Sequence, residues 1–99
     1  MVSLTPLEFE FDKDLRHILE KERDLNLCSR RFREMLDRYC GVETAHRLLK
    51  TNPEPMFEYL RSKSKLDLTM EFYVVMEKYR SLFSDGEREA AQWRLDHGA

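Results

Sequence analysis

Apolar side chains recur along this chain at intervals of three and four residues, the spacing that places them on one face of an α-helix. The first stripe, which only Glu22 interrupts, predicts a helix capped by Asp12 and running to residue 24. Residues 1–11 are then predicted to be a loosely ordered N-terminal segment. The second stripe predicts a helix that is capped by Ser29 and ends at Gly41 in the left-handed conformation.

Four further segments carry helix signals. Residues 43–49 predict a short third helix, and Pro55 suits the first turn of a short fourth helix. The polar residues 61–65 predict a loop. Residues 69–79 predict a fifth helix that begins with a threonine cap and is apolar on both sides. The last helix, 84–97, opens with a capping box in which a serine and a glutamate each bind the other's backbone.

Composition favours the same class of fold. Only 3 glycines and 3 prolines are present, too few to supply the turns of an all-β chain. Hydrophobic residues make up 41% and charged residues 36%, enough for one modest core beneath a wide solvated surface. We therefore expect an all-α protein, an irregular bundle of five to six short helices in a single domain that spans residues 1–99.

The sequence offers no sign of a membrane span or of a disulfide. No apolar run approaches the roughly 20 residues that cross a bilayer, so we expect a cytoplasmic protein without membrane contact. Cys28 and Cys40 would lie about 18 Å apart on one helix, too far for a disulfide. With no C-x-x-C pair, structural zinc is not expected either.

Catalytic and metal-binding patterns are also missing. No serine, threonine or cysteine lies in a strained turn, and no glycine-rich loop is present to hold a phosphate, so we expect no enzymatic activity and no cofactor. The pairs Asp14-x-x-His17 and Glu43-x-x-His46 superficially match the carboxylate–histidine pairs of metal-binding helical bundles. Such pairs must face the bundle interior, and these lie on the outer side or at the edge of their apolar stripes. We expect no metal.

Basic residues concentrate in the middle of the chain, where residues 28–65 hold nine basic and five acidic side chains. A basic helix can follow nucleic-acid phosphates, so nucleic-acid binding through the helix of Arg30 to Arg38 is the alternative functional hypothesis. Residues at i and i+4, such as Arg30 with Glu34 and Arg33 with Asp37, can neutralise much of this charge locally. The candidate contacts are Arg30, Arg31, Arg33, Arg61, Lys63 and Lys65.

Surplus apolar side chains suggest a surface for a partner. Met70, Tyr73 and Val74 exceed what one stripe per helix requires, which fits either a central helix or an interface. Trp93 differs, because small and aliphatic neighbours already supply the inward positions of the last helix. Since tryptophan is enriched at protein interfaces, these four residues form the candidate interface. The leading hypothesis is a non-enzymatic interaction or accessory module that binds an unknown protein partner or itself.

Three segments in a fixed order carry a family resemblance. They are GVETAHRLL at residues 41–49, LDLTME at 66–71 and LFS at 82–84. Together they resemble a family of small uncharacterised bacterial helical modules over roughly residues 15–95. The resemblance implies a bacterial origin and a compact helical fold. It implies no activity, cofactor or catalytic residue.

Overall fold

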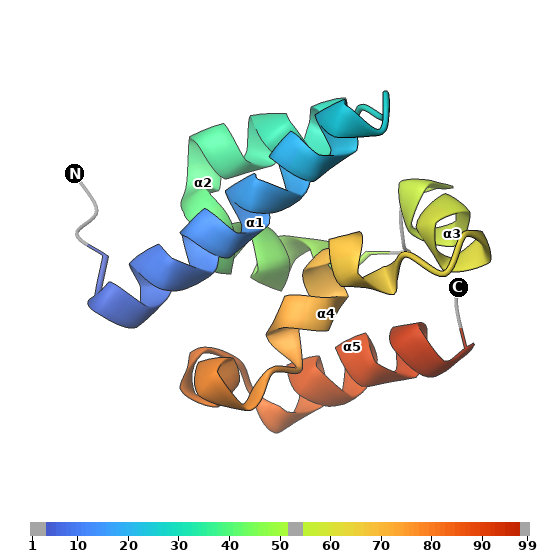
Figure 1. Cartoon of the computed structure of the whole chain (residues 1–99). Coiled ribbons are helices and arrows are strands. Elements are labelled where there is room, and N and C mark those ends of the chain that lie inside the picture. The colour runs from blue at the N-terminus through green and yellow to red at the C-terminus, as the bar shows by residue number, and fades with distance from the viewer. Residues whose placement is uncertain (1–3, 52–54, 98–99) are drawn as a thin grey trace.

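Five α-helices and two 3₁₀ helices make up the computed structural model in its described residues, 4–51 and 55–97, with no strand among them (Figure 1). In chain order they are α1 (Pro6–Asp24), α2 (Arg30–Leu48), α3 (Pro55–Ser62), the 3₁₀ helix η1 (Leu66–Leu68), α4 (Met70–Val74), the 3₁₀ helix η2 (Glu77–Leu82) and α5 (Asp85–His97). The predicted all-α class is therefore confirmed. None of these helices is long and apolar enough to cross a membrane.

The first helix begins earlier than predicted. Thr5, not Asp12, is its N-cap, and the backbone N–H groups of Thr5 and Glu8 each donate to the other's side chain, at 2.9 and 3.2 Å. Pro6 takes the first helical position, where its missing N–H does no harm. The prediction that residues 1–11 are loosely ordered is thus wrong from Pro6 onward, and residues 1–3 lie outside the described residues.

The second helix contains the predicted break, but at a different residue. Cys40 has φ 64° and ψ 178°, a backbone region that residues other than glycine rarely adopt, and the chain is helical on both sides of it. Gly41 was predicted to carry the left-handed conformation and is instead helical. Its missing side chain serves packing, because a Cβ there would lie 2.7 Å from the Cα of Asp12 in α1.

The predicted fifth helix is interrupted. Thr69 caps α4 as expected, but the helix ends at Val74 and the chain turns before η2. A continuing helix would direct the Val75 carbonyl to an N–H four residues later, and here the guanidinium of Arg88 donates to that carbonyl at 3.3 Å. The turn lets the ring of Tyr79 reach Phe11 of α1, with the ring centroids 4.9 Å apart.

The ends of the other helices follow the prediction more closely. The backbone N–H of Ser84 donates to Glu87 at 3.0 Å and the N–H of Glu87 donates to Ser84 at 3.1 Å, which confirms the capping box of α5. α3 begins at Pro55 as predicted and buries Phe57 and Leu60. It continues to Ser62, so the predicted loop begins two residues too early.

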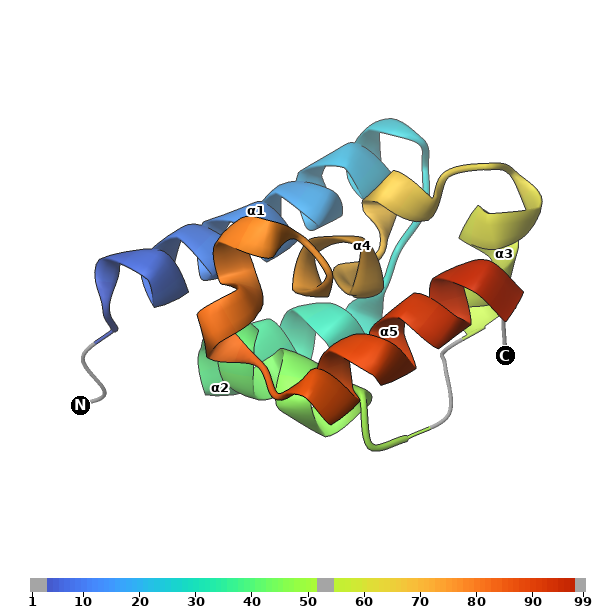
Figure 2. The same cartoon turned by 90° about the horizontal axis from the view of Figure 1, so that it is seen from below.

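The core forms where α4 lies between the other helices. α1 packs against α2, and α4 contacts α1 on one side and α5 on the other (Figure 2). The buried apolar cluster consists of Phe11, Leu15, Ile18, Leu36, Ala45, Leu48, Met70, Val74, Tyr79, Phe83 and Ala91. Because both sides of α4 are covered, both of its sides are apolar.

Candidate functional site

A small pocket opens next to this core. Its volume is about 70 Å³, and its walls are mostly apolar side chains of α1 to α4 and η1, such as Ile18, Phe32, Phe57, Leu60 and Met70. Three charged residues also line it, namely Glu22, Glu71 and Arg94. Charged groups in an apolar pocket need partners, so the bonds of each of the three decide what the pocket can bind.

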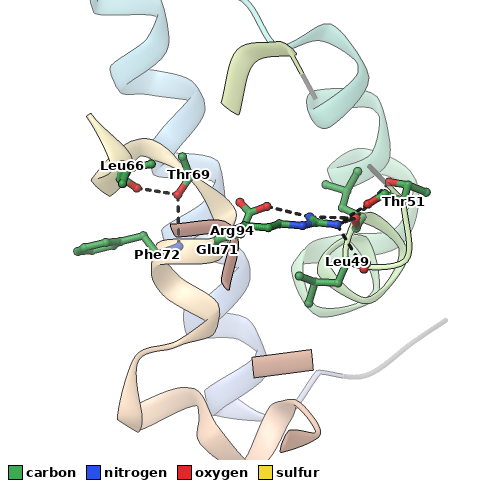
Figure 3. A network of polar contacts seen from close by, with 8 residues as sticks. Leu49, Thr51, Leu66, Thr69, Glu71, Phe72 and Arg94 are labelled. Carbon is green, nitrogen blue, oxygen red and sulfur yellow. Dashed lines mark hydrogen bonds and ion pairs between the residues drawn. The ribbon is translucent and has the colours of Figure 1, made fainter. Parts of the chain in front are cut away.

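Arg94 joins three helices at this pocket (Figure 3). Arg94 is 8% exposed, and its guanidinium donates to the Glu71 carboxylate at 3.0 Å and to the Leu48 and Leu49 carbonyls at 3.3 and 3.4 Å. It also bonds the Thr51 carbonyl. The Leu48 and Leu49 carbonyls lie at the C-terminal end of α2, and the Thr51 carbonyl lies just beyond it. A helix end lacks internal donors and attracts positive charge. Arg94 therefore caps α2 from α5, while Glu71 neutralises it.

The Glu71 carboxylate remains in an unfavourable environment despite this bond. Burial raises the pKa of Glu71, and the bond from Arg94 offsets only part of that rise. Nearby, Thr69 donates its hydroxyl to the Leu66 carbonyl at 2.6 Å and accepts the Phe72 N–H at 3.3 Å (Figure 3). The side chains of Glu71 and Thr69 thus both have partners within the protein, and we assign both residues to fold stability.

Glu22 differs, because one of its oxygens has no partner. The residue is 2% exposed, and its Oε2 accepts a hydrogen bond from the Ser29 hydroxyl at 2.8 Å. Its Oε1 is buried and receives no hydrogen bond from any described residue. Burial raises the pKa of Glu22, although Ser29 and the charge of Arg33 act in the opposite direction. Ser29 was predicted to cap α2 and makes no such bond, because its hydroxyl serves Glu22 instead.

Sequence analysis did not identify Glu22 as a candidate. Its one signal was that it interrupts an otherwise apolar stripe, and an interrupted stripe usually reflects a residue at the edge of a buried face. The burial of Glu22 depends on α2, α3 and α4 packing around it, which a local pattern does not reveal.

The predicted basic contacts come from two segments of the chain, one in α2 and one at the end of α3. Arg30 pairs with Glu34 at 3.1 Å, as expected from the spacing, whereas Asp37 binds Arg16 of α1 at 3.0 Å. Arg61 donates to the Asp96 carbonyl at the end of α5, at 3.3 Å. Arg30, Arg31 and Arg33 lie in the first turn of α2, whereas Arg61 lies in the last turn of α3 and Lys63 and Lys65 follow that helix.

A basic groove does form on α2, from partly different residues. Arg31, Arg38, Arg47 and Lys50 line it together with Tyr39, and the Arg47 guanidinium lies 3.9 Å from the centre of the Tyr39 ring. Two glutamates, 34 and 43, also line it and reduce its positive charge. Among the described residues of this groove, none comes from the 61–65 segment.

The candidate interface separates into buried and exposed residues. Met70 and Val74 belong to the core, so their assignment to an interface was wrong, because α4 is central and both of its sides are covered. Tyr73 is half-buried against that core. Trp93 is 55% exposed, and its indole stacks on the His97 ring with the ring centroids 4.6 Å apart.

The two carboxylate–histidine patterns do not form pairs. His17 bonds Glu20 at 3.2 Å, and His46 bonds Glu87 of α5, so neither imidazole binds the carboxylate three residues before it. Within the described residues no three histidine, cysteine or acidic side chains converge as metal ligands do. Both cysteines are free thiols, with Cys28 exposed and Cys40 half-buried.

The resemblance to bacterial helical modules stays a prediction. A scan against protein-family models found no model that matches this chain, and searches of curated proteins and of solved structures found no match either.

Proposed function

We propose that this protein is a non-enzymatic interaction module, and that it binds a protein partner or a second copy of itself through the outer face of α5 around Trp93. The observation that carries the proposal is the exposure of Trp93, 55%, on a helix whose inward positions are already filled by Ala91 and Arg94. A large indole left in solvent gains hydrophobic free energy when a partner covers it.

The surroundings of Trp93 support this role. The stacked His97 ring also bonds the Trp93 carbonyl at 3.2 Å, so the two rings hold each other in one orientation and lose little conformational entropy on binding. The bond of Arg61 to the Asp96 carbonyl joins α3 to the same end of α5. Tyr59 of α3, 46% exposed, is a second aromatic side chain on this neighbouring helix.

Sedimentation velocity over a series of protein concentrations tests the proposal for self-association, and co-sedimentation with a partner tests the heterotypic case. Trp93→Ala should weaken association by about 1–2 kcal/mol, roughly 5- to 30-fold in Kd, without changing the helical circular dichroism. Gln92→Ala, an exposed change on the same helix, is the matched control. A monomer whose Trp93→Ala form binds every partner as tightly as the parent chain contradicts the proposal.

The basic groove on α2 supports a second candidate, nucleic-acid binding. Four cationic side chains, Arg31, Arg38, Arg47 and Lys50, surround it, and each neutralised phosphate would release a counterion. Single-stranded and duplex DNA and RNA should then bind with an affinity that falls steeply with salt, and Arg38→Ala should flatten that dependence. Arg80→Ala, outside the groove, is the control. Binding that disappears at about 200 mM salt and is insensitive to Arg38 rejects this candidate.

A further inference from the structure

The outer face of α5 carries an acidic stripe around Trp93. Its members are exposed and follow one another at intervals of three and four residues, which places them on one side of the helix. They are Asp85, Glu89, Trp93 and Asp96. None of the three carboxylates forms an ion pair within residues 4–51 and 55–97. Arg88 of α5 bonds Glu77 instead, at 3.5 Å, and Arg61 of α3 bonds a backbone carbonyl.

Helix stability does not account for this stripe. Asp96 lies in the last turn of α5, where the partial negative charge of the helix end disfavours a carboxylate. Trp93 leaves 55% of its surface in solvent between Glu89 and Asp96. The outer face of α5 thus offers one large aromatic ring with negative charge on both sides of it, and a basic aromatic surface is its complement.

The groove on α2 has the opposite charge. Both glutamates that line it are already paired, at 3.1 Å with Arg30 and at 2.9 Å with Arg47. Two further cations of the groove, Arg38 and Lys50, form no ion pair within the described part of the chain. Their positive charge is therefore available to an acidic partner.

The groove also has room for an aromatic ring and a surface on which it can stack. Its volume is about 620 Å³, roughly four times the ~150 Å³ of a cavity that holds benzene, so an indole fits. The Arg47 guanidinium lies 3.9 Å from the centre of the Tyr39 ring, and the Arg47 side chain is 49% exposed. A second ring can stack on this guanidinium, and tryptophan is the aromatic residue that binds cations best.

We propose that the outer face of α5 docks into the α2 groove of a second copy of this chain. The Trp93 indole stacks on the Arg47 guanidinium, and the acidic stripe lies against the remaining cations of the groove. Charge complementarity identifies the occupant, because the two exposed surfaces of opposite charge each present an aromatic ring. Since this contact uses Trp93, it rests on the proposed function of α5 and names a second copy as the partner.

One chain does not fill its own groove, because the two surfaces point away from the core that their helices share. α5 buries Ala91 and Arg94 on its inner side, and α2 buries Thr44, Ala45 and Leu48 on its own. Each copy therefore offers its groove to one neighbour and its α5 face to another. Such head-to-tail contacts repeat until a ring closes or a filament grows, whereas a contact between two identical faces stops at a dimer.

Sedimentation velocity of the full chain, from about 10 μM to about 1 mM, tests the proposal. The parent chain should form species that grow with concentration. Trp93→Ala and Arg38→Glu should each weaken this association at least about tenfold while the helical circular dichroism stays unchanged. Phe9→Ala, at an exposed aromatic residue of α1, and Arg80→Glu, at an exposed arginine outside the groove, are the matched controls and should associate like the parent.

A mixture of the two variants tests the head-to-tail geometry directly. The Trp93→Ala chain keeps an intact groove, and the Arg38→Glu chain keeps an intact α5 face. Together they should form one contact and stop at a heterodimer, although each variant alone stays monomeric. Because salt screens exposed charges, the association of the parent chain should also weaken between about 0.05 and about 0.5 M sodium chloride.

The possible failures have different meanings. Association that depends on Trp93 but not on Arg38 overturns the head-to-tail contact and leaves the interface on α5 in place. A parent chain that is monomeric at about 1 mM, or variants that form no heterodimer, also overturns it. If Arg38→Glu removes nucleic-acid binding and leaves self-association unchanged, the groove serves nucleic acid and the inference is wrong. A Trp93→Ala chain that associates like the parent contradicts this contact and the proposed function together.

Discussion

Replacing Arg94 should destabilise this protein more than any other single change to its polar residues. Arg94→Met keeps much of the side-chain volume but removes the donors to Glu71 and to the carbonyls of Leu48, Leu49 and Thr51. Removing one partner of a buried ion pair costs about 3–5 kcal/mol, because the other charge stays buried alone. Small domains unfold at a total cost of about 5–15 kcal/mol, so the variant should lose about a fifth or more of its stability.

Urea unfolding followed by far-ultraviolet circular dichroism measures this loss. At roughly 4–8 °C per kcal/mol for a domain of this size, the melting temperature should also fall by at least about 12 °C. Arg88→Met is the matched control, because its guanidinium donates to the Val75 carbonyl at 3.3 Å from a less buried site and should cost about 1 kcal/mol.

A double variant separates the two roles of Arg94. Glu71→Met with Arg94→Met removes the unpaired charge and should recover part of the loss, whereas the Leu49 and Thr51 carbonyls, which lose the guanidinium as a donor, keep the recovery incomplete. An Arg94→Met protein within about 1 kcal/mol of the parent chain would show that the guanidinium neither neutralises Glu71 nor caps α2, and would refute the reasoning.

Three further changes test other parts of the structure by the same unfolding measurement. Gly41→Ala should cost about 1–3 kcal/mol of stability, because its Cβ would lie 2.7 Å from the backbone of α1. Gly86→Ala, where the nearest atom would lie 3.9 Å away, should instead gain about 0.4–1 kcal/mol. Equal effects of the two changes would exclude the close approach of Gly41 to α1. Burial raises the pKa of Glu22. The free energy that the titration of Glu22 contributes to stability is therefore fully present below its unfolded pKa, near 4.5, and is lost as the pH rises through its pKa in the folded protein. Glu22→Met should therefore exceed the parent stability by about 1–3 kcal/mol at pH 8, with the difference shrinking toward pH 4, and a constant difference would contradict this account. Tyr79→Phe removes the hydroxyl that donates to Asp14 and should cost about 1–2 kcal/mol; no change would show that water replaces the bond.

The sequence was informative wherever a structure depends on neighbours within one helical turn. The caps at Thr69 and at Ser84, the start of α3 at Pro55 and the exposure of Trp93 all follow from short-range patterns. One local signal was missed, since Thr5 and Glu8 form a complete capping box in the printed sequence. That signal by itself predicts the start of α1 at Pro6.

Local patterns do not predict the pocket, because its residues come from five α-helices and one 3₁₀ helix. Glu22 interrupts an apolar stripe whether it is buried or lies at the edge, and only the packing of α2, α3 and α4 makes it a buried carboxylate. Arg94 likewise falls within a helix that is rich in charged residues. Its bonds to Glu71 and Leu48 span 23 and 46 positions of the chain.

The amino-acid sequence by itself determined the all-α class, the approximate number of helices and the caps at Thr69 and Ser84, because hydrophobic periodicity and capping act between residues three or four positions apart. Tertiary structure decided where helices are interrupted and which charges are buried. α4 ends where Arg88 takes the Val75 carbonyl, and Gly41 lies against Asp12 across two helices. These contacts join distant parts of the chain, and their free energies exceed the small helix propensities that a local pattern measures.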